Sequence, residues 1–246
     1  MIKLGILVVA YNAESTIERT LSRIPQNFAD KISSVLISDD ASIDSTHSKA
    51  QEFAKNSNLP IKIAVQKTNL GYGGNQKFGY KWAIENDLDY IILLHADGQY
   101  APEFLPEIFE TLVTSNVAGV FGSRMINKKN ALKGGMPLYK WIGNQILSNL
   151  QNILAHQSFS EWHSGYRAYK VSALRKINFD KLSNGFRFDT QIILEILRQD
   201  EKIVEIEIPT FYGDEISHVN GFIYALEIIW DTCRYSLEVA CRKLKK

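Results

Sequence analysis

Short runs of apolar, mostly β-branched residues alternate with segments of helical periodicity along the first 125 residues. An apolar run bounded by turn residues predicts a buried strand, whereas apolar positions that recur every three or four residues predict a helix. The pattern predicts strands at residues 2–10, 32–38, 61–66, 89–94 and 117–123. It predicts the intervening helices at residues 13–24, 42–56, 73–86 and 102–115. We therefore expect an α/β fold whose mostly parallel sheet has helices on both faces.

The pattern changes after residue 125. Residues 125–135 are polar and end in two glycines, which predicts a mobile loop. The remaining elements are predicted as helices at 137–155, 188–199 and 220–243, strands at 166–170 and 202–208, and a loop at 210–219. Since no repeat, low-complexity segment or linker interrupts the chain, we expect a single domain, with a sheet-based first half (1–125) and a mixed second half (126–246).

Composition narrows the class of protein only slightly. The chain has 246 residues and a formal net charge of +1, so no global field favours a nucleic acid as partner. Its two cysteines, Cys233 and Cys241, have neither a zinc spacing nor a disulfide framework, which favours a reducing, cytoplasmic setting. The basic end CRKLKK has two open interpretations, a solvated helix end or a peripheral contact with anionic lipid at the inner face of a membrane.

Candidate chemistry gathers where the predicted strands end. In an open parallel sheet, ligands bind beyond the carboxyl ends of the strands. The segments at those ends are residues 11–14, 39–42, 69–75 and 95–99. The third segment, NLGYGGN, has three glycines before a helix, where backbone can approach a ligand closely and an anion is favoured. It matches neither the dinucleotide fingerprint nor the P-loop, and a plain turn is the alternative.

Three acids lie on this predicted rim. Asp39, Asp40 and Asp97 could each be a helix cap or a turn former. Their occurrence together, near a glycine-rich loop, favours a site for a hard cation such as magnesium or manganese, which prefers oxygen ligands. Asp97 and Gln99 both supply oxygen and are two residues apart.

Taken in order, the segments VVAYNAE, SDDAS, HADGQ, GSR, HSGYRAY and IPTFYGDEISHVN resemble the family 2 glycosyltransferases. The likeness covers about 220 residues and is greatest to the polyprenyl-phosphate (dolichol-phosphate) hexosyltransferase branch. The resemblance implies a GT-A, Rossmann-like fold. It makes residues 1–125 the half that binds the nucleotide sugar and residues 126–246 the acceptor side.

The resemblance also implies residue roles on the donor side. Residues of the first three rim segments would bind the nucleotide, with Asp40 on its base or ribose; the set is Ala10, Tyr11, Asn12, Glu14, Asp39, Asp40, Asn69, Gly71 and Gly73. Asp97 matches the second acid of the family's D-x-D metal motif, Gln99 is a further metal ligand, and His218 is a candidate third ligand. The chain departs from the motif at His95, which stands in place of the first acid and is expected to face the base or the metal's outer shell.

On the acceptor side, Glu161 and His163 compete for the role of base, and a surface acid is the alternative for Glu161. Arg124 and Arg167 could each pair with phosphate or form structural ion pairs.

One or two of the aromatics Tyr72, Trp141, Trp162 and Tyr212 could stack on base or sugar. Lys128, Lys129 and Lys133 lie in the predicted mobile loop, which could close over the substrates.

The resulting expectation is an inverting, metal-dependent hexosyltransferase that uses a UDP- or GDP-sugar. The acceptor is expected to be a polyprenyl phosphate or another lipid or saccharide, and a homodimer is a further expectation.

One alternative to this function is a sugar-1-phosphate nucleotidyltransferase, although its opening G-x-G-T-R is replaced here by Tyr11-Asn12-Ala13-Glu14. The other is a non-catalytic protein that binds nucleotide sugars, which His95 favours.

Overall fold

The computed structural model describes residues 2–210 and 220–243. Within these ranges, seven strands form one sheet in the order β3-β2-β1-β4-β6-β5-β7. The strands are β1 (Leu4–Ala10), β2 (Ile32–Asp39), β3 (Ile61–Val65), β4 (Tyr90–His95), β5 (Gly119–Ser123), β6 (Arg167–Lys170) and β7 (Ile203–Glu207). Every predicted strand is present, within a few residues of its predicted ends.

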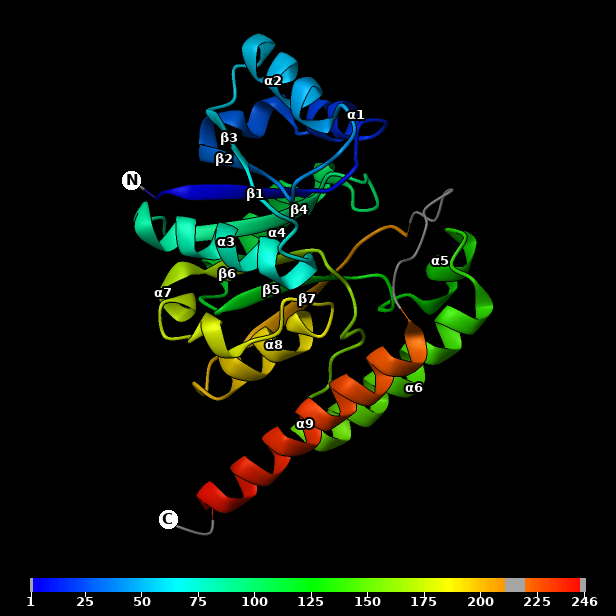
Figure 1. Cartoon of the computed structure of the whole chain (residues 1–246). Coiled ribbons are helices and arrows are strands. Elements are labelled where there is room, and N and C mark those ends of the chain that lie inside the picture. The colour runs from blue at the N-terminus through cyan, green and yellow to red at the C-terminus, as the bar shows by residue number, and fades with distance from the viewer. Residues whose placement is uncertain (1, 211–219, 244–246) are drawn as a thin grey trace.

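The sheet is mostly parallel, as predicted. Strands β3, β2, β1 and β4 run parallel to one another, and β5 runs parallel to β7. Strand β6 lies between β4 and β5 and is antiparallel to both. The carboxyl ends of β1, β2, β3 and β4 therefore meet at one edge of the sheet, and the N-terminus of the chain lies at the opposite edge (Figure 1).

Helices cover both faces of the sheet. One face packs against α1 (Ile17–Ser22), α2 (Thr46–Asn56) and α4 (Leu105–Thr114). The other face packs against α3 (Tyr72–Glu85), α7 (Val171–Leu174) and α8 (Phe188–Leu197). Short 3-10 turns occupy Gln26–Lys31, Pro102–Phe104 and Phe179–Lys181. This is the α/β arrangement that the alternating pattern predicts.

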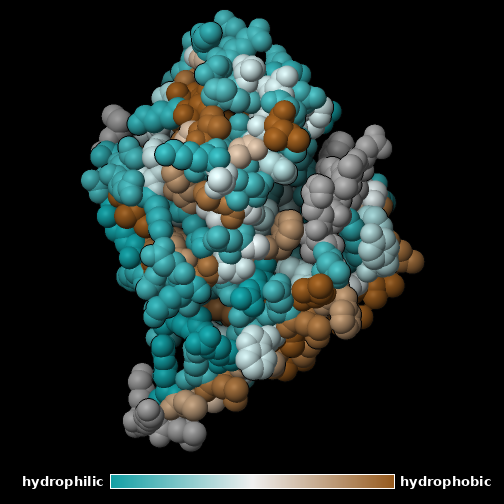
Figure 2. Space-filling model, viewed as in Figure 1, coloured by the Kyte–Doolittle hydropathy of each residue, from teal (hydrophilic) through white to brown (hydrophobic). Residues whose placement is uncertain are grey.

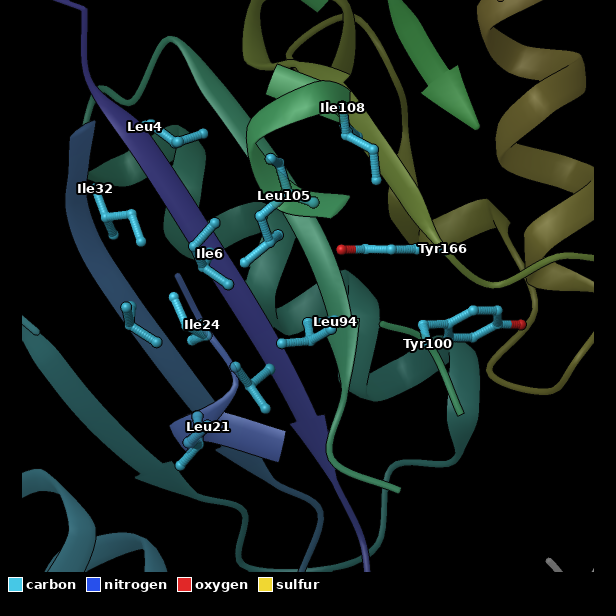
Figure 3. Packing of buried hydrophobic residues seen from close by; sticks show 14 of the residues in the cluster. Leu4, Ile6, Leu21, Ile24, Ile32, Leu94, Tyr100, Leu105, Ile108 and Tyr166 are labelled. Carbon is cyan, nitrogen blue, oxygen red and sulfur yellow. The ribbon is translucent and has the colours of Figure 1, made fainter. Parts of the chain in front are cut away.

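The core has two layers because successive side chains of a strand point to opposite faces. Ile6 of β1 packs in the layer below α1 and α4, whereas its neighbour Leu7 packs in the layer with α3 and α8. Figure 3 shows the first layer, in which Ile6 and Leu94 of the sheet meet Leu105 of α4. Both residue layers of the central strands are thus buried, which explains their continuous apolar sequence.

The prediction of a mobile loop at 125–135 is wrong, because this segment contains the helix α5 (Lys128–Lys133). Its apolar residues Met125, Ala131 and Met136 form a small buried cluster against Trp141. A helix of six residues is too short for its periodicity to be recognised among lysines and asparagines. The segment is anchored also at Gly134, where an added Cβ would lie 2.2 Å from the carbonyl oxygen of Thr210.

Two long helices follow outside the sheet layers. Helix α6 (Leu138–Ala155) and helix α9 (Gly221–Lys243) pack side by side and extend away from the sheet (Figure 1). In the described part of the chain, no helix combines the length and the apolarity that crossing a bilayer requires.

Candidate functional site

The carboxyl edge of the sheet brings the predicted rim segments together. Ala10 at the end of β1 is paired with Asp39 at the end of β2. On the other side of β1, Val9 is paired with His95 at the end of β4. The loops that follow these three strands consequently lie next to one another, although they are up to 85 residues apart in the chain (10 to 95).

Asn12 and Glu14 connect the loop after β1 to the loop after β2. Asn12 has a positive φ of 48°, its amide donates to Ser42 Oγ (2.9 Å), and its Oδ1 accepts from the Ile43 amide (3.0 Å). Glu14 Oε2 accepts from the Ser45 amide (2.9 Å). These side chains hold two loops in place, whereas the ring of Tyr11, between them and the strand, is half exposed.

Asp39 and Asp40 are adjacent but differ in their contacts. Both oxygens of Asp40 accept backbone amides, from Leu70 (2.7 Å) and from Gly71 (3.1 Å). Asp39 Oδ1 accepts the Ser42 amide (3.0 Å), but its buried Oδ2 has no hydrogen-bond partner. Burial raises the pKa of Asp40, and its two amide donors act in the opposite direction. Asp40 thus positions the glycine loop, and Asp39 has the open acceptor oxygen.

The glycine loop approaches the protein's own backbone. The amides of Gly73 and Gly74 donate to the carbonyl oxygen of Asn184, at 2.7 and 3.2 Å. A Cβ on Gly73 would lie 2.5 Å from Cβ of Phe188, so no larger residue fits. Gly71 has a φ of 82° and donates to Asn69 Oδ1 (2.9 Å). Of the glycines expected to approach the nucleotide, Gly73 has its amide already occupied by the turn around residue 184, so that amide is not open to a ligand.

Asp97 and His95, two residues apart, face different environments. Asp97 is exposed in a tight turn, where its Oδ1 accepts the Gln99 amide (2.9 Å). His95 is buried between the rings of Tyr72 and Tyr100, at centroid distances of 5.7 and 5.2 Å, and its Nε2 has no partner. Among the described residues, no group of three or more His, Cys, Asp or Glu side chains is placed to hold a metal ion. Only Asp97 and Gln99 of the predicted ligands are therefore found at the rim, because His218 lies outside the described residues.

Arg124 and Glu161 form a buried ion pair. The Arg124 amide and Nε donate to Glu161 (2.7 and 3.1 Å), its Nη2 also pairs with Oε1, and Asn144 of α6 donates to Oε1 (2.7 Å). Burial raises the pKa of Glu161, but the charge and hydrogen bonds of Arg124 outweigh it and leave the pKa lowered. Glu161 is 1% exposed. The hypotheses that it is a surface acid or a free base are both contradicted, because its oxygens are enclosed and already paired.

His163 is the other candidate base. Its Nδ1 is 3.0 Å from the hydroxyl of Tyr224 in α9, and its Nε2 has no hydrogen-bond partner. Burial lowers the pKa of His163 to about 4, so the ring is neutral at pH 7. Of the two residues, only His163 has a side-chain atom without a hydrogen-bond partner, the buried Nε2.

Arg167 has a structural role. Its guanidinium is completely buried and donates to the carbonyl oxygens of Ser164 (2.7 Å), Asp189 (2.6 Å) and Trp162 (2.9 Å). These bonds hold the segment that leads into β6 against α8. The prediction that Arg167 pairs with a phosphate is wrong, because its donors point to backbone inside the core.

Three of the four aromatic side chains predicted to stack on base or sugar lie in the described residues, and each has contacts inside the protein. Trp162 is completely buried in the core, and Trp141 donates to the carbonyl of Lys128 (3.0 Å). Tyr72 is stacked on Phe186 at 4.9 Å and donates to Asp189 Oδ2 (2.8 Å). Tyr212 lies outside the described residues.

The sequence interpretation missed Asp189 and Asn144. Asp189 accepts from Tyr72 and Gln76 and lies 3.6 Å from Arg167 Nη2. Asn144 connects α6 to the Arg124–Glu161 pair. Both residues occur within helical patterns, and no local signal distinguishes them from ordinary polar helix positions.

Comparison with known proteins gives a consistent result. The family model described as Glycosyl transferase family 2 matches residues 5–177. An undecaprenyl-phosphate mannosyltransferase of Micrococcus luteus is 29% identical over 238 residues, which are 94% of this chain and 93% of that protein. A UDP-N-acetylglucosamine–dolichyl-phosphate N-acetylglucosaminyltransferase of Methanococcus voltae is 27% identical over 220 residues, 85% of this chain and 86% of that protein.

Solved structures give the same fold. The glucosyl-3-phosphoglycerate synthase of Mycobacterium tuberculosis, crystallised with Mn²⁺, UDP-glucose and phosphoglyceric acid, has a TM-score of 0.71. The likeness covers 95% of this chain and 79% of that chain at 13% sequence identity, so it concerns the fold alone.

Proposed function

The chain belongs to glycosyltransferase family 2 and has sugar transferases to polyprenyl phosphates among its relatives; on that premise, we propose that it moves a hexose from a UDP- or GDP-sugar to a polyprenyl phosphate, with inversion. One observation supports this most. The open oxygen of Asp39 lies at the end of β2, and the exposed carboxylate of Asp97 comes just after β4; these are the two strands that flank β1. One carboxylate is thus available for a nucleotide base and the other for a metal ion at the diphosphate.

The donor's base would bind at Asp39. Uracil and guanine both present a ring N–H, and a buried carboxylate oxygen without a donor is a strong acceptor for such a group. Tyr11, whose ring is half exposed beside this position, would cover the base. Residues 1–125 would then form the donor half and residues 126–246 the acceptor half.

The diphosphate would lie near Asp97 and Gln99. These oxygen donors fit magnesium or manganese, which usually take further ligands from substrate phosphates and water. When bound, such a cation neutralises negative charge on the departing diphosphate. Asp97 would hold it at the rim, and the turn that Asp97 Oδ1 makes with the Gln99 amide fixes the direction of the carboxylate.

The acceptor phosphate would attack the anomeric carbon directly. Its oxygen is already anionic, so a new C–O bond forms while the bond from that carbon to the diphosphate oxygen breaks, and no proton needs to be removed. This fits the enclosure of Glu161, which has no free oxygen for a base's role. If a saccharide hydroxyl were the acceptor instead, His163 Nε2 would be the group available to receive its proton.

The direct test is release of nucleoside diphosphate from UDP- and GDP-hexoses, with and without a short-chain polyprenyl phosphate, in Mn²⁺, Mg²⁺ or EDTA. We expect acceptor-dependent release of UDP or GDP with one donor. Pyrophosphate release would instead indicate a nucleotidyltransferase. Nucleotide binding without turnover under any metal would indicate a non-catalytic protein.

A prediction about Asp97 tests the metal's place. Asp97→Asn retains an acceptor for the Gln99 amide but removes the charge, so we expect transfer to fall at least about 100-fold while the melting temperature is unchanged. Asp97→Ala should lose the same activity and also the turn. Wild-type transfer by Asp97→Asn would refute a metal role for this residue.

A further inference from the structure

Helix α6 exposes most of its large apolar side chains to solvent. Six large apolar side chains on its outer face are between 39% and 72% exposed: Leu138, Tyr139, Ile142, Ile146, Leu150 and Ile153. They recur every three or four residues and so form one stripe. The face toward the protein is instead mostly polar, with Asn144, Ser148 and Gln151 all buried. A helix on the surface of a water-soluble protein instead turns its apolar stripe toward the core and its polar face toward solvent.

Hydrogen bonds hold α6 in this orientation. Asn144 donates to Glu161, and Ser148 donates to Asn144 Oδ1 (3.1 Å) and accepts from the Trp162 amide (3.2 Å). Gln151 Nε2 lies 3.3 Å from Thr232 Oγ1 of α9. Rotating the helix to bury its apolar face would break these bonds inside the protein, so the stripe stays on the outside.

Helix α9 extends the same surface. Its exposed apolar side chains also form one stripe and are 54% to 75% exposed: Phe222, Ile223, Leu226, Trp230 and Leu237. Glu227 and Asp231 turn away from it toward Arg187, and Glu238 turns toward Arg198. We refer to the stripes of α6 and α9 together as the apolar flank. Figure 2 shows brown side chains along the lower right border of the molecule, where α6 and α9 lie in Figure 1.

Positive charge lies beside the apolar flank. Residues 125–160 contain four lysines and no aspartate or glutamate. Three of these lysines, Lys128, Lys129 and Lys133, are exposed on α5, next to the first turn of α6. An anionic surface complements them, whereas a second copy of the chain would bring the same acid-free segment. Tyr139 and Trp230, which are exposed among the aliphatic residues, suit the boundary between headgroups and acyl chains.

We propose that the apolar flank docks on the surface of a lipid bilayer that has anionic headgroups. The inference rests on the proposed function in one respect, that the acceptor is anchored in such a bilayer. Arg124 lies four residues before α5, and its partner Glu161 is bonded to Asn144 on the inner face of α6. Docking through α6 therefore brings the acceptor half of the protein next to the membrane surface.

The test is co-sedimentation with vesicles of phosphatidylcholine alone or mixed with phosphatidylglycerol, with no polyprenyl phosphate present. We expect the wild type to bind the mixed vesicles, and Ile142→Glu and Ile146→Glu each to weaken binding about tenfold, since each replaces an exposed apolar side chain that docking would bury in the bilayer. Ile2→Glu is the matched control, because Ile2 is 45% exposed, Ile142 is 44% exposed, and Ile2 lies at the far edge of the sheet. The control should bind like the wild type.

Two further measurements separate lipid from protein as the occupant. Replacing Lys128, Lys129 and Lys133 with alanine should weaken binding to the mixed vesicles and remove most of its salt dependence. Sedimentation velocity without vesicles should give a monomer for the wild type and for Ile146→Glu. A wild-type dimer that Ile146→Glu converts to monomers would overturn the proposal, as would vesicle binding equal in the wild type and Ile146→Glu, or absent from both.

Transfer to a water-soluble, short-chain acceptor phosphate distinguishes this proposal from the proposed function. Ile142→Glu and Ile146→Glu should retain that activity and lose transfer to a long-chain acceptor in vesicles. If the wild type bound vesicles through the apolar flank but transferred no sugar to either acceptor, docking would stand and the proposed function would fail. Equal loss of both transfers in Ile146→Glu, with vesicle binding retained, would overturn docking.

Discussion

At the scale of single residues, the two neighbouring acids at the end of β2 differ in their hydrogen bonds. Both oxygens of Asp40 accept bonds, from the amides of Leu70 and Gly71, whereas one oxygen of Asp39 has no partner. A buried acceptor without a donor is costly, so it is expected where a ligand supplies the donor. The difference between the two residues can be measured.

Asp39→Asn should weaken nucleotide binding about tenfold or more with little change in melting temperature, because an amide NH₂ replaces the acceptor. Asp40→Asn should instead lower the melting temperature by about 2–4 °C, since a donor would face a loop amide at a cost of about 1 kcal/mol. Calorimetric titration with UDP and GDP, and thermal unfolding of both variants, check this pair. Identical effects of the two substitutions would contradict the division of roles.

At the scale of elements, Gly73 in the first turn of α3 is packed too tightly to be replaced by a residue with a side chain. Gly73 lies against Phe188 and the carbonyl oxygens of Ser183 and Gly185, so the turn after the 3-10 segment closes the glycine loop from outside. This contact joins the first half of the chain to the second. It explains three glycines in the loop without any need for a ligand at their amides.

Gly73→Ala should destabilise the protein strongly, by about 3 kcal/mol or more, because the new Cβ would lie 2.5 Å from Cβ of Phe188 and 2.8 Å from the Ser183 oxygen. Gly185→Ala is the matched control, since its nearest neighbour would be Ser183 Oγ at 3.6 Å. Urea unfolding of both variants measures the difference. A Gly73→Ala protein as stable as Gly185→Ala would show that the turn can move aside.

At the scale of the whole molecule, the ionisation of His163 links stability to pH. Burial lowers its pKa from 6.5 to about 4 in the folded protein, the Glu161 charge opposes this, and the charges of Arg167 and Arg124 add to it. The unfolded chain therefore binds more protons between these two values. Stability is fully present above pH 6.5 and decreases as the pH falls toward 4.

His163→Asn removes this titration and retains a group that can bond to Tyr224. We expect the loss of stability between pH 7 and pH 4 to be about 1 kcal/mol smaller in the variant, a value reduced for the partial exposure of the ring. Thermal unfolding at several pH values compares the two proteins. Parallel pH profiles would mean that His163 has the same pKa folded and unfolded.

Prediction from sequence was most successful for the central strands and least successful for contacts between distant segments. A strand buried on both faces is a continuous apolar run, so β1 and β4 are readily predicted. Helix α6 is also evident from its periodicity, but periodicity alone does not say which face lies outward. Its bonds to Glu161, to the Trp162 amide and to Thr232 of α9 place the polar face inside.

By itself, the sequence determined the alternation of strands and helices, the rim segments at the carboxyl ends of the strands, and the family. These follow from local periodicity and from short motifs, which need no knowledge of distant residues. The tertiary structure decided that Asp39 rather than Asp40 has an open oxygen, that Glu161 and Arg167 are enclosed, and that α6 presents an apolar face. The reason is physical: the availability of a side chain depends on partners such as Leu70 and Asn144, which only folding brings to it.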